Sequence, residues 1–422
     1  MLARVGDHPS GCRRGKGFCL LECLLLVVCI SCAPPGRLRR GRPERVGMDP
    51  EVLSRIDDVA EEEVEAGKVP GCVVLVARKG VIVWEKAYGY HPLQPQKVAN
   101  SPSTVYDLAS LTKPIATATA VALLLEDGKL ALEDRVTEYL PSFGQNGKSD
   151  VTIADLLAHV SGLKPYLDVS LLQKEHGPGP KPDAVIAEIS ALPKAYERGK
   201  SCVYSCLNFV VLAKIVEEVS GEPMDTFLKR RVWQPLGMND TGFFPGEEKQ
   251  ERAAPTRPDG SPEYRGKVHD PVARYYASAE HVCGNAGLFS TARDLATFAQ
   301  MLLNGGTYGG KRILRSETVH HFTTTRTPAG LPAKGMGWDV DSPYSPQVRG
   351  EIIPAGDSFG HTGFTGCSLW IDRRSQAFLI ILSNRTHVEE GDVRRLRHDI
   401  ATIVGSSIDL YSTQPRHRNP AQ

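Results

Sequence analysis

The chain has 422 residues, of which 41% are hydrophobic and 23% are charged, and its formal net charge at pH 7 is +1. This length and composition suffice for one large globular domain or two closely packed subdomains with a substantial core. The nearly balanced charge of the whole chain gives no support for nucleic-acid binding.

The first 33 residues predict an export signal. Four basic residues lie before position 17, and the apolar segment 18–33 that follows ends in small residues. A basic segment followed by an apolar one is typical of a secretory signal. We therefore expect a secreted or periplasmic protein, with membrane anchoring through this N-terminal segment as the alternative. Residues 34–44 are rich in Pro, Gly and Arg and predict an unstructured basic linker.

From residue 45 the sequence takes the pattern of a folded domain. Asp49 and Pro50 predict the start of a helix that runs to about residue 67. Two apolar segments, 72–78 and 81–88, flank the dipeptide Lys79-Gly80. This pattern predicts a β-hairpin.

The other end of the chain repeats this combination of strands and a helix. Strands are expected at 366–372 and 377–383, a helix follows at about 391–404, and we assign 406–422 to a C-terminal tail. Together the two ends predict an α/β domain at 45–405, with an antiparallel sheet built from both termini and flanked by helices. The segment from 110 to about 303 is expected to form an inserted, mainly helical domain.

Ser110 and Lys113 form a Ser-x-x-Lys motif at the predicted start of a helix. Good helix formers follow at 115–125, and Pro114 suits a first helical turn. Residues three apart share a helical face, so the Lys113 amine is expected beside the Ser110 hydroxyl, at the positive end of the helix dipole. This arrangement predicts a nucleophile with an adjacent base. The alternative for Ser110 is an ordinary helix N-cap.

Two further segments carry groups that suit the same chemistry. Tyr204 lies just ahead of an apolar helix predicted at 209–216 and can share a proton with a Ser–Lys pair. His361, Thr362 and Gly363 lead into a strand, and a Thr-Gly strand end offers backbone donors for an oxyanion.

Other motifs are absent or are expected to be structural. A second match, Ser161 with Lys164, falls at the C-terminal end of a predicted helix and is assigned a structural role. The sequence lacks the ligand spacings of common metal sites and the Gly-x-Ser-x-Gly elbow of α/β-hydrolases. We predict no metal and no cofactor.

Together these motifs resemble the serine β-lactamase and penicillin-binding protein family, in particular its class C-like branch with DD-peptidases and carboxylesterases. The resemblance covers nearly all of 45–405 and rests on the segments 69–71, 108–114, 128–130, 156–163, 235–238, 287–290 and 359–363. It implies a β-lactamase/transpeptidase-like fold and an acyl-enzyme mechanism. In that mechanism Ser110 attacks a carbonyl, Lys113 and Tyr204 manage the protons, and the N–H groups of Ser110 and of a residue just after Gly363 bind the oxyanion.

The chain departs from the family pattern at two of the positions to which we assign substrate contacts, which are Cys206, His361, Thr362 and Gly363. Cys206 stands where the family usually has the Asn of Tyr-x-Asn, and a thiol is a weaker donor and acceptor than an amide. His361 stands where many members have Lys, and with an ordinary pKa of about 6.5 it would make carboxylate recognition depend on pH. Both changes weaken groups that would hold a β-lactam.

The resulting prediction is an exported serine hydrolase that cleaves an ester or an amide through an acyl-Ser110 intermediate. An esterase or D-Ala-D-Ala carboxypeptidase fits these departures better than a β-lactamase does. The expected partner is a small-molecule or peptide substrate, such as an ester, a peptidoglycan-like peptide or a β-lactam, and not a nucleic acid. The alternatives are a β-lactamase proper and a non-catalytic binding protein that retains the fold.

Overall fold

A computed structural model of the chain describes residues 36–93, 96–257, 264–278 and 280–412. The chain divides into the units 1–33 and 34–422, and all described residues belong to the second. The predicted export signal therefore lies outside the described residues. Within them, no helix combines the length and the apolar character needed to cross a membrane.

The domain is organised around an eight-stranded sheet in the order β1-β3-β2-β12-β11-β10-β9-β8. Neighbouring strands are antiparallel except for β1, which runs parallel to β3 at one edge. The strands are β1 (Arg39–Arg40), β2 (Gly71–Arg78), β3 (Val81–Gly89), β8 (Ala333–Lys334), β9 (Asp339–Asp341), β10 (Ser358–Thr362), β11 (Ser368–Asp372) and β12 (Ala377–Ser383). Strands from the two chain ends pair at β2 and β12, which confirms the predicted sheet.

The β2–β3 hairpin forms where the sequence predicts it. Lys79 and Gly80 both adopt a left-handed backbone, with φ of 48° and 76°, as a tight two-residue hairpin turn requires. β2 is buried on both faces, because Val73 and Leu75 point into one core while Val74 and Val76 point into another. The strand thus lies between two layers of helices.

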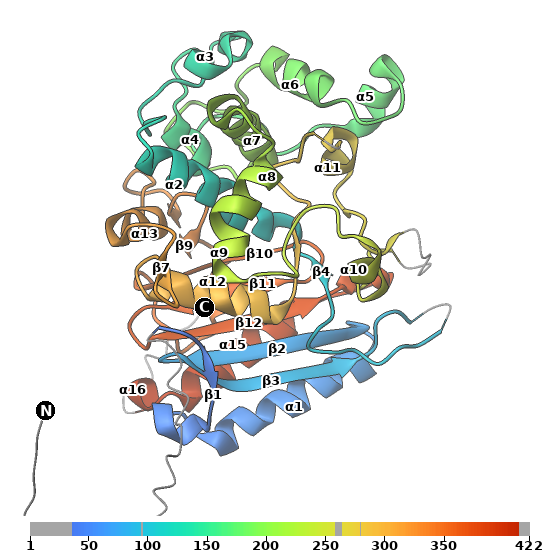
Figure 1. Cartoon of the computed structure of the whole chain (residues 1–422), viewed down its shortest axis with the longest axis vertical. Coiled ribbons are helices and arrows are strands. Elements are labelled where there is room, and N and C mark those ends of the chain that lie inside the picture. Colours follow the sequence, from blue (N-terminus) through green and yellow to red (C-terminus); the bar gives the residue numbers. More distant parts are fainter. Residues whose placement is uncertain (1–35, 94–95, 258–263, 279, 413–422) are drawn as a thin grey trace, which may run out of the picture. The chain divides into compact units, whose positions relative to one another are not determined.

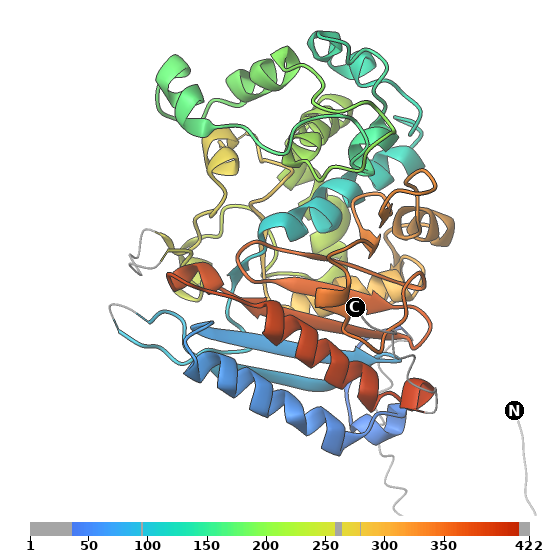
Figure 2. The same cartoon turned by 180° about the vertical axis from the view of Figure 1, so that it is seen from behind.

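Helices cover both faces of the sheet (Figure 1 and Figure 2). α1 (Pro50–Glu65) and α15 (Arg394–Ser407) pack on one face, where Leu53 and Leu396 join the same core as Val74. The Asp49 carboxylate caps α1 by accepting the Glu51 N–H at 2.9 Å. α12 (Ala292–Leu303) contacts β2 and β12 from the other side, below the inserted helical region.

The predicted insertion, from 110 to about 303, is mainly helical and most of its helices are short, but its last helix, α12, packs on the sheet. Its other helices are η2 (Ala109–Leu111), η3 (Lys113–Ala118), α2 (Thr119–Glu126), α3 (Val136–Tyr139), η4 (Pro141–Gly144), α4 (Ile153–Leu157), α5 (Val169–His176), α6 (Pro182–Ala191), α7 (Cys206–Ser220), α8 (Met224–Leu228), η5 (Lys229–Trp233), α9 (Gln234–Leu236), α10 (Glu247–Glu251) and α11 (Pro271–Tyr276). α13 (Ser316–Thr323) and α14 (Pro346–Arg349) follow α12. The short strand pairs are β4 (Tyr106–Asp107) with β5 (Phe289–Ser290) and β6 (Thr307–Tyr308) with β7 (Lys311–Arg312).

Two predicted boundaries are wrong. The segment 34–44 is not an unstructured linker throughout, because β1 pairs with β3 and a 3₁₀ helix, η1 (Pro43–Val46), follows. The predicted tail from residue 406 begins too early, because α15 runs to Ser407 and α16 (Asp409–Ser412) follows. Ile408 and Tyr411 are buried against the α1 side of the sheet, which gives this segment a place in the core.

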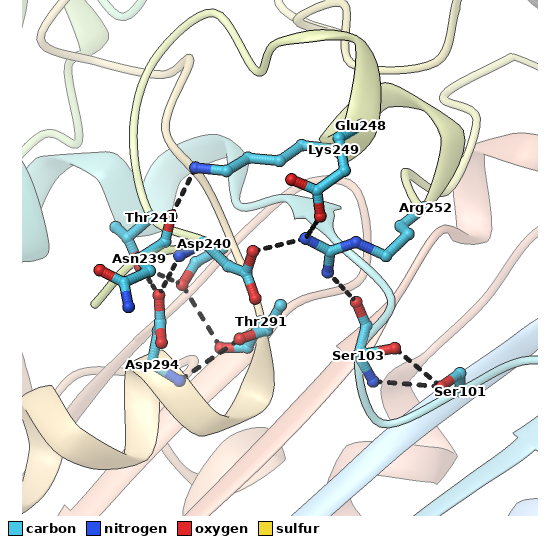
Figure 3. Close-up of polar contacts among 11 residues, drawn as sticks. Ser101, Ser103, Asn239, Asp240, Thr241, Glu248, Lys249, Arg252, Thr291 and Asp294 are labelled. Atoms are coloured by element: carbon cyan, nitrogen blue, oxygen red, sulfur yellow. Dashed lines mark hydrogen bonds and ion pairs between the residues drawn. The ribbon is translucent and has the colours of Figure 1, made fainter. Parts of the chain in front are cut away.

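A polar cluster supports the β4–β5 pair, which leads into the motif at Ser110 (Figure 3). Ser290 Oγ lies 2.7 Å from Thr241 Oγ1, and Thr241 Oγ1 donates to Asp294 at 2.9 Å. Arg252 forms an ion pair with Asp240 at 2.5 Å. These contacts join segments that are far apart in the sequence and hold the strand pair in place.

Candidate active site

Ser110 and Lys113 contact each other in a tight, irregular turn. Ser110 lies in the 3₁₀ turn η2, and Lys113 begins the π-helical segment η3, so the predicted single α-helix is wrong at this point. The Lys113 Nζ nevertheless donates to Ser110 Oγ at 3.0 Å and to the Asn285 carbonyl at 2.9 Å. Because Lys113 is fully buried, its amine is held in one position beside the hydroxyl.

Asp107 connects this turn to two other walls of the site. Its carboxylate accepts the Ala109 N–H at 2.9 Å and the His269 N–H at 2.7 Å, and its carbonyl accepts the Thr365 hydroxyl at 2.7 Å. Ala109 adopts a left-handed backbone with φ of 46°, an unfavourable conformation for a residue with a Cβ. Burial raises the pKa of Asp107 to about 6, although both N–H bonds favour its charged form.

Gly363 brings the end of β10 against the same turn. A Cβ at this position would lie 2.3 Å from the Leu108 carbonyl oxygen, so only glycine allows the two backbones to approach this closely. In the described part of the chain, neither the Ser110 N–H nor the Phe364 N–H donates to another backbone carbonyl. Two backbone donors are therefore available on either side of this contact.

Tyr204 completes the group of proton-carrying side chains. The Lys113 Nζ lies 5.0 Å from the centre of the Tyr204 ring, and both Lys113 and Ser110 are near enough to influence the pKa of Tyr204. The His159 ring packs against the Tyr204 ring, and the two ring centroids lie 4.7 Å apart. His159 Nδ1 also accepts the Ser205 N–H at 3.1 Å, which gives the histidine a structural role.

The proton balance of the site depends on Lys113 and Tyr204 together. Burial raises the pKa of Tyr204, and nearby Lys113 partly opposes that rise. For Lys113, burial lowers the pKa, whereas Cys206 and Tyr204 raise it when they are anionic, and the net direction is upward. An amine beside a phenol and an ammonium beside a phenolate carry the same number of protons, so Lys113 and Tyr204 titrate as one pair.

The residues of the His-Thr-Gly segment line the site, but His361 does not have the pH-dependent charge that the sequence predicts. His361 Nδ1 lies 2.8 Å from the Thr362 carbonyl, which can only accept, so this nitrogen carries the proton and Nε2 keeps its lone pair. Burial, with Lys113 and Lys334 nearby, lowers the pKa of His361 to about 3. The imidazole is therefore neutral at physiological pH, and the pH-dependent carboxylate binding expected from the sequence is not supported.

Two cavities meet at Ser110. One, of about 1060 Å³, includes Tyr204, His361, Thr362 and Gly363 in its wall. The other, of about 750 Å³, lies between the segment 166–173 and the segment 269–275, which contains most of α11. Tyr166 and Phe364 line both cavities and mark the boundary between them. A substrate at Ser110 can therefore place one part in each cavity.

Comparison with known proteins identifies the family. The Beta-lactamase family model matches residues 56–402. A protein of Escherichia coli K12 named as a D-alanyl-D-alanine carboxypeptidase is 32% identical over 408 residues, covering 88% of this chain and 91% of the relative. A protein of the same name from Salmonella typhi is 31% identical over 380 residues, covering 83% and 86%. The chain belongs to the β-lactamase family.

Solved structures agree with the predicted β-lactamase/transpeptidase-like fold. EstCE1, described as a hydrolase with promiscuous acyltransferase activity, has a TM-score of 0.68 at 23% identity and covers 84% of this chain and 99% of its own. A penicillin-binding protein homologue from Caulobacter crescentus has a TM-score of 0.67 at 23% identity, and the match covers 86% of this chain and 99% of the homologue. Together with the family match, this makes the chain a serine hydrolase of the β-lactamase family.

The family departure at Cys206 affects the centre of the site. Cys206 begins α7, is buried, and lies near enough to Lys113 and Tyr166 to raise the pKa of both when it is anionic. Asn208 does not take over its position, because its amide oxygen accepts the Ser161 hydroxyl at 2.6 Å in the core. Ser161 is thereby confirmed as a structural residue. In this β-lactamase-family site a thiol stands where an amide is usual.

The sequence did not reveal several residues that hold the site together. Asp107 and Asn285 contact the Ser110 turn, while Lys334 and Arg397 come from β8 and α15 to line the larger cavity. Asp107 directly precedes the segment 108–114 and Asn285 lies two residues before 287–290, and both segments carried the family resemblance, whereas Lys334 and Arg397 lie in none of these segments. Across the described residues, no group of three or more His, Cys, Asp or Glu side chains could hold a metal ion.

A neutral His361 predicts carboxylate recognition that does not change with pH. We expect a constant ratio of kcat/KM between pH 5 and 8 for an ester whose leaving group carries a carboxylate and for its methylated form. A histidine with a lowered pKa becomes charged only below about pH 3. Steady-state kinetics of the two substrates measure this ratio. A rise in the ratio as the pH falls from 8 to 5, lost in His361→Asn, would show that His361 gains charge in this range.

Proposed function

We propose that this protein hydrolyses an ester or amide through an acyl-Ser110 intermediate, with a D-Ala-D-Ala carboxypeptidase-like or esterase-like substrate. The observation that carries the proposal is the 3.0 Å contact between the buried Lys113 amine and the Ser110 hydroxyl. When the Lys113–Tyr204 pair carries one proton fewer than its fully protonated form, it can take the hydroxyl proton at the moment of attack. A purely binding function would not need this contact.

Acylation uses groups on three elements. Ser110 Oγ attacks the substrate carbonyl carbon while its proton passes to the Lys113–Tyr204 pair. The carbonyl oxygen becomes an oxyanion and accepts hydrogen bonds from the Ser110 and Phe364 N–H groups. When the tetrahedral intermediate collapses, the bond to the leaving group breaks and Tyr204 returns the proton to that group. Ser110 is left as an ester.

Deacylation repeats these steps with water as the nucleophile. A water molecule attacks the acyl carbon and gives a proton to the same pair, while the two N–H groups again hold the oxyanion. Cleavage of the ester bond returns a proton to Ser110 Oγ and releases the acid.

The larger cavity suits a leaving group with a carboxylate. Cationic side chains outnumber anionic ones in its lining. The cationic residues are Lys334, Arg385, Arg394 and Arg397, and the anionic residues are Asp339, Glu390 and Asp392. The smaller cavity offers apolar contacts to an acyl group, from Leu167, Val169, Val272 and Tyr275. This division favours a peptide ending in D-alanine, in agreement with the names of the relatives.

Intact-mass spectrometry tests the acyl intermediate. The wild-type chain is exposed separately to p-nitrophenyl butyrate, a D-Ala-D-Ala peptide and a fluorescent penicillin. We expect a stoichiometric adduct with at least one of them and none in Ser110→Ala. Lys113→Met should slow its formation by about 100- to 10,000-fold, the usual contribution of a positioned base. Lys164→Met, from the second Ser-x-x-Lys match, is the control and should acylate at the wild-type rate.

The absence of an adduct with all three reagents, or an adduct that persists in Ser110→Ala, would overturn this proposal. The absence of an adduct would favour a binding protein that retains the fold.

Replacing Cys206 by Asn tests why β-lactams are expected to be poor substrates. The amide should restore hydrogen bonds worth about 0.5–1.5 kcal/mol and raise the rate of acylation by penicillin about 3- to 10-fold. The rate with p-nitrophenyl butyrate should change less. Stopped-flow fluorescence measures the penicillin rate, and Cys202→Asn, at a cysteine that lines the larger cavity, should give no gain. Rapid turnover of cephalosporins by the wild type, with esters ignored, would instead identify a β-lactamase proper.

We also propose that residues 1–33 direct export, on the basis of their basic and then apolar sequence. Loss of the protein from the secreted or periplasmic fraction when these residues are removed would support this assignment.

A further inference from the structure

The arginine Arg397 on α15 binds the backbone on the far side of the proposed oxyanion hole. Its Nη2 donates to the Gly363 carbonyl at 2.9 Å and to the Cys367 carbonyl at 2.8 Å. The Gly363 carbonyl and the Phe364 N–H belong to one planar peptide group, and in a trans peptide they point in opposite directions. A donor that fixes this carbonyl therefore also fixes the direction of the N–H.

The surroundings of Arg397 concentrate its charge on these carbonyls. Within the described residues Arg397 forms no ion pair, and its Nε is buried without a partner. Burial lowers the pKa of Arg397 to about 10, which leaves the guanidinium charged at neutral pH. A charged donor on a carbonyl polarises the whole peptide group and strengthens the hydrogen bond that its N–H donates.

A second arginine restrains the next peptide group. Arg385 Nε donates to the Phe364 carbonyl at 2.6 Å, and its guanidinium carbon lies 4.4 Å from the centre of the Phe364 ring. Its own N–H donates to the Thr365 carbonyl at 2.8 Å. Phe364 is thus held from both sides although its side chain is 58% exposed.

We infer that Arg397 is a positioning residue for catalysis, which orients and polarises the Gly363–Phe364 peptide group so that the Phe364 N–H binds the oxyanion. This inference rests on the proposed acyl-Ser110 mechanism. It assigns a role to a side chain that touches neither Ser110 nor the reacting carbonyl. It also explains why a half-buried cationic side chain lies against uncharged backbone at this end of β10.

Two readouts test the role of Arg397. The first is NMR of full-length chain labelled with ¹³C in glycine carbonyls and ¹⁵N in phenylalanine. The sequence contains three Gly-Phe pairs, so three carbonyl–amide correlations are expected, and Phe364→Leu assigns the one of interest. Arg397→Met should move the Gly363–Phe364 signal and leave the other two in place. Arg395→Met, on the same helix but paired with Glu62 and Glu63, should move none of them.

The second readout is turnover of p-nitrophenyl butyrate, which carries no carboxylate and so does not report charge recognition in the cavity. Arg397→Met should lower kcat about tenfold with little change in KM, less than the roughly 100- to 1,000-fold cost of losing an oxyanion donor outright. Arg397→Lys should recover most of kcat, because a single nitrogen makes both backbone contacts. Arg395→Met should keep the wild-type kcat.

The outcomes separate the two proposals. An unmoved Gly363–Phe364 signal, or a moved signal with unchanged kcat, overturns the role of Arg397 while leaving the acyl mechanism intact. If Arg397→Met does not fold, the kcat of Arg397→Lys tests the inference instead. A kcat of Arg397→Lys as low as that of Ser110→Ala would overturn it. Absence of any Ser110 adduct in the wild type overturns the proposed function, and the catalytic role of Arg397 falls with it, whatever the NMR signal shows.

Discussion

The contact between Gly363 and the Leu108 carbonyl is the constraint on which the site depends. No side chain fits between the end of β10 and the turn that carries Ser110, since a Cβ at Gly363 would lie 2.3 Å from that oxygen. The approach sets the separation of the two free N–H groups. Asp107 holds it from one side through Ala109 and Thr365, at the cost of a strained backbone at Ala109.

Burial determines the charges of the site. Lys113 is held between the Ser110 hydroxyl and the Asn285 carbonyl, and it shares its proton balance with Tyr204. The same amine, together with Lys334, helps to keep His361 neutral. The positive charge that many family members place at this position, near the end of β10, is therefore absent from His361. In this protein the cations of the larger cavity come instead from β8 and from the segments around and within α15.

Sequence patterns predict those parts of the structure that depend on local periodicity. The β2–β3 hairpin, the pairing of the two chain ends and the Ser110–Lys113 contact follow from short apolar segments, turn residues and motif spacing. The π-helical segment at Lys113 could not be predicted, because it contacts distant backbone, as in the Thr117 hydroxyl bond to the Gly284 carbonyl at 2.7 Å. Likewise, the lowered pKa of His361 and the backbone contacts of Arg397 arise only when remote segments meet. The sequence did not predict the pairing of β1 with β3. Backbone hydrogen bonds form this pairing, and the arginine side chains of β1 give no apolar pattern.

Substitution of Gly363 by alanine is the most direct test of this account. The acylation rate by p-nitrophenyl butyrate is measured in a single turnover, with thermal unfolding as a check of the fold. We expect Gly363→Ala to remain folded and to lose at least about 100-fold in rate, the usual cost of a displaced oxyanion donor. Gly242→Ala, where an added Cβ meets nothing within 4 Å, should acylate like the wild type. A Gly363→Ala variant with the wild-type acylation rate would contradict the claim that this close approach forms the site.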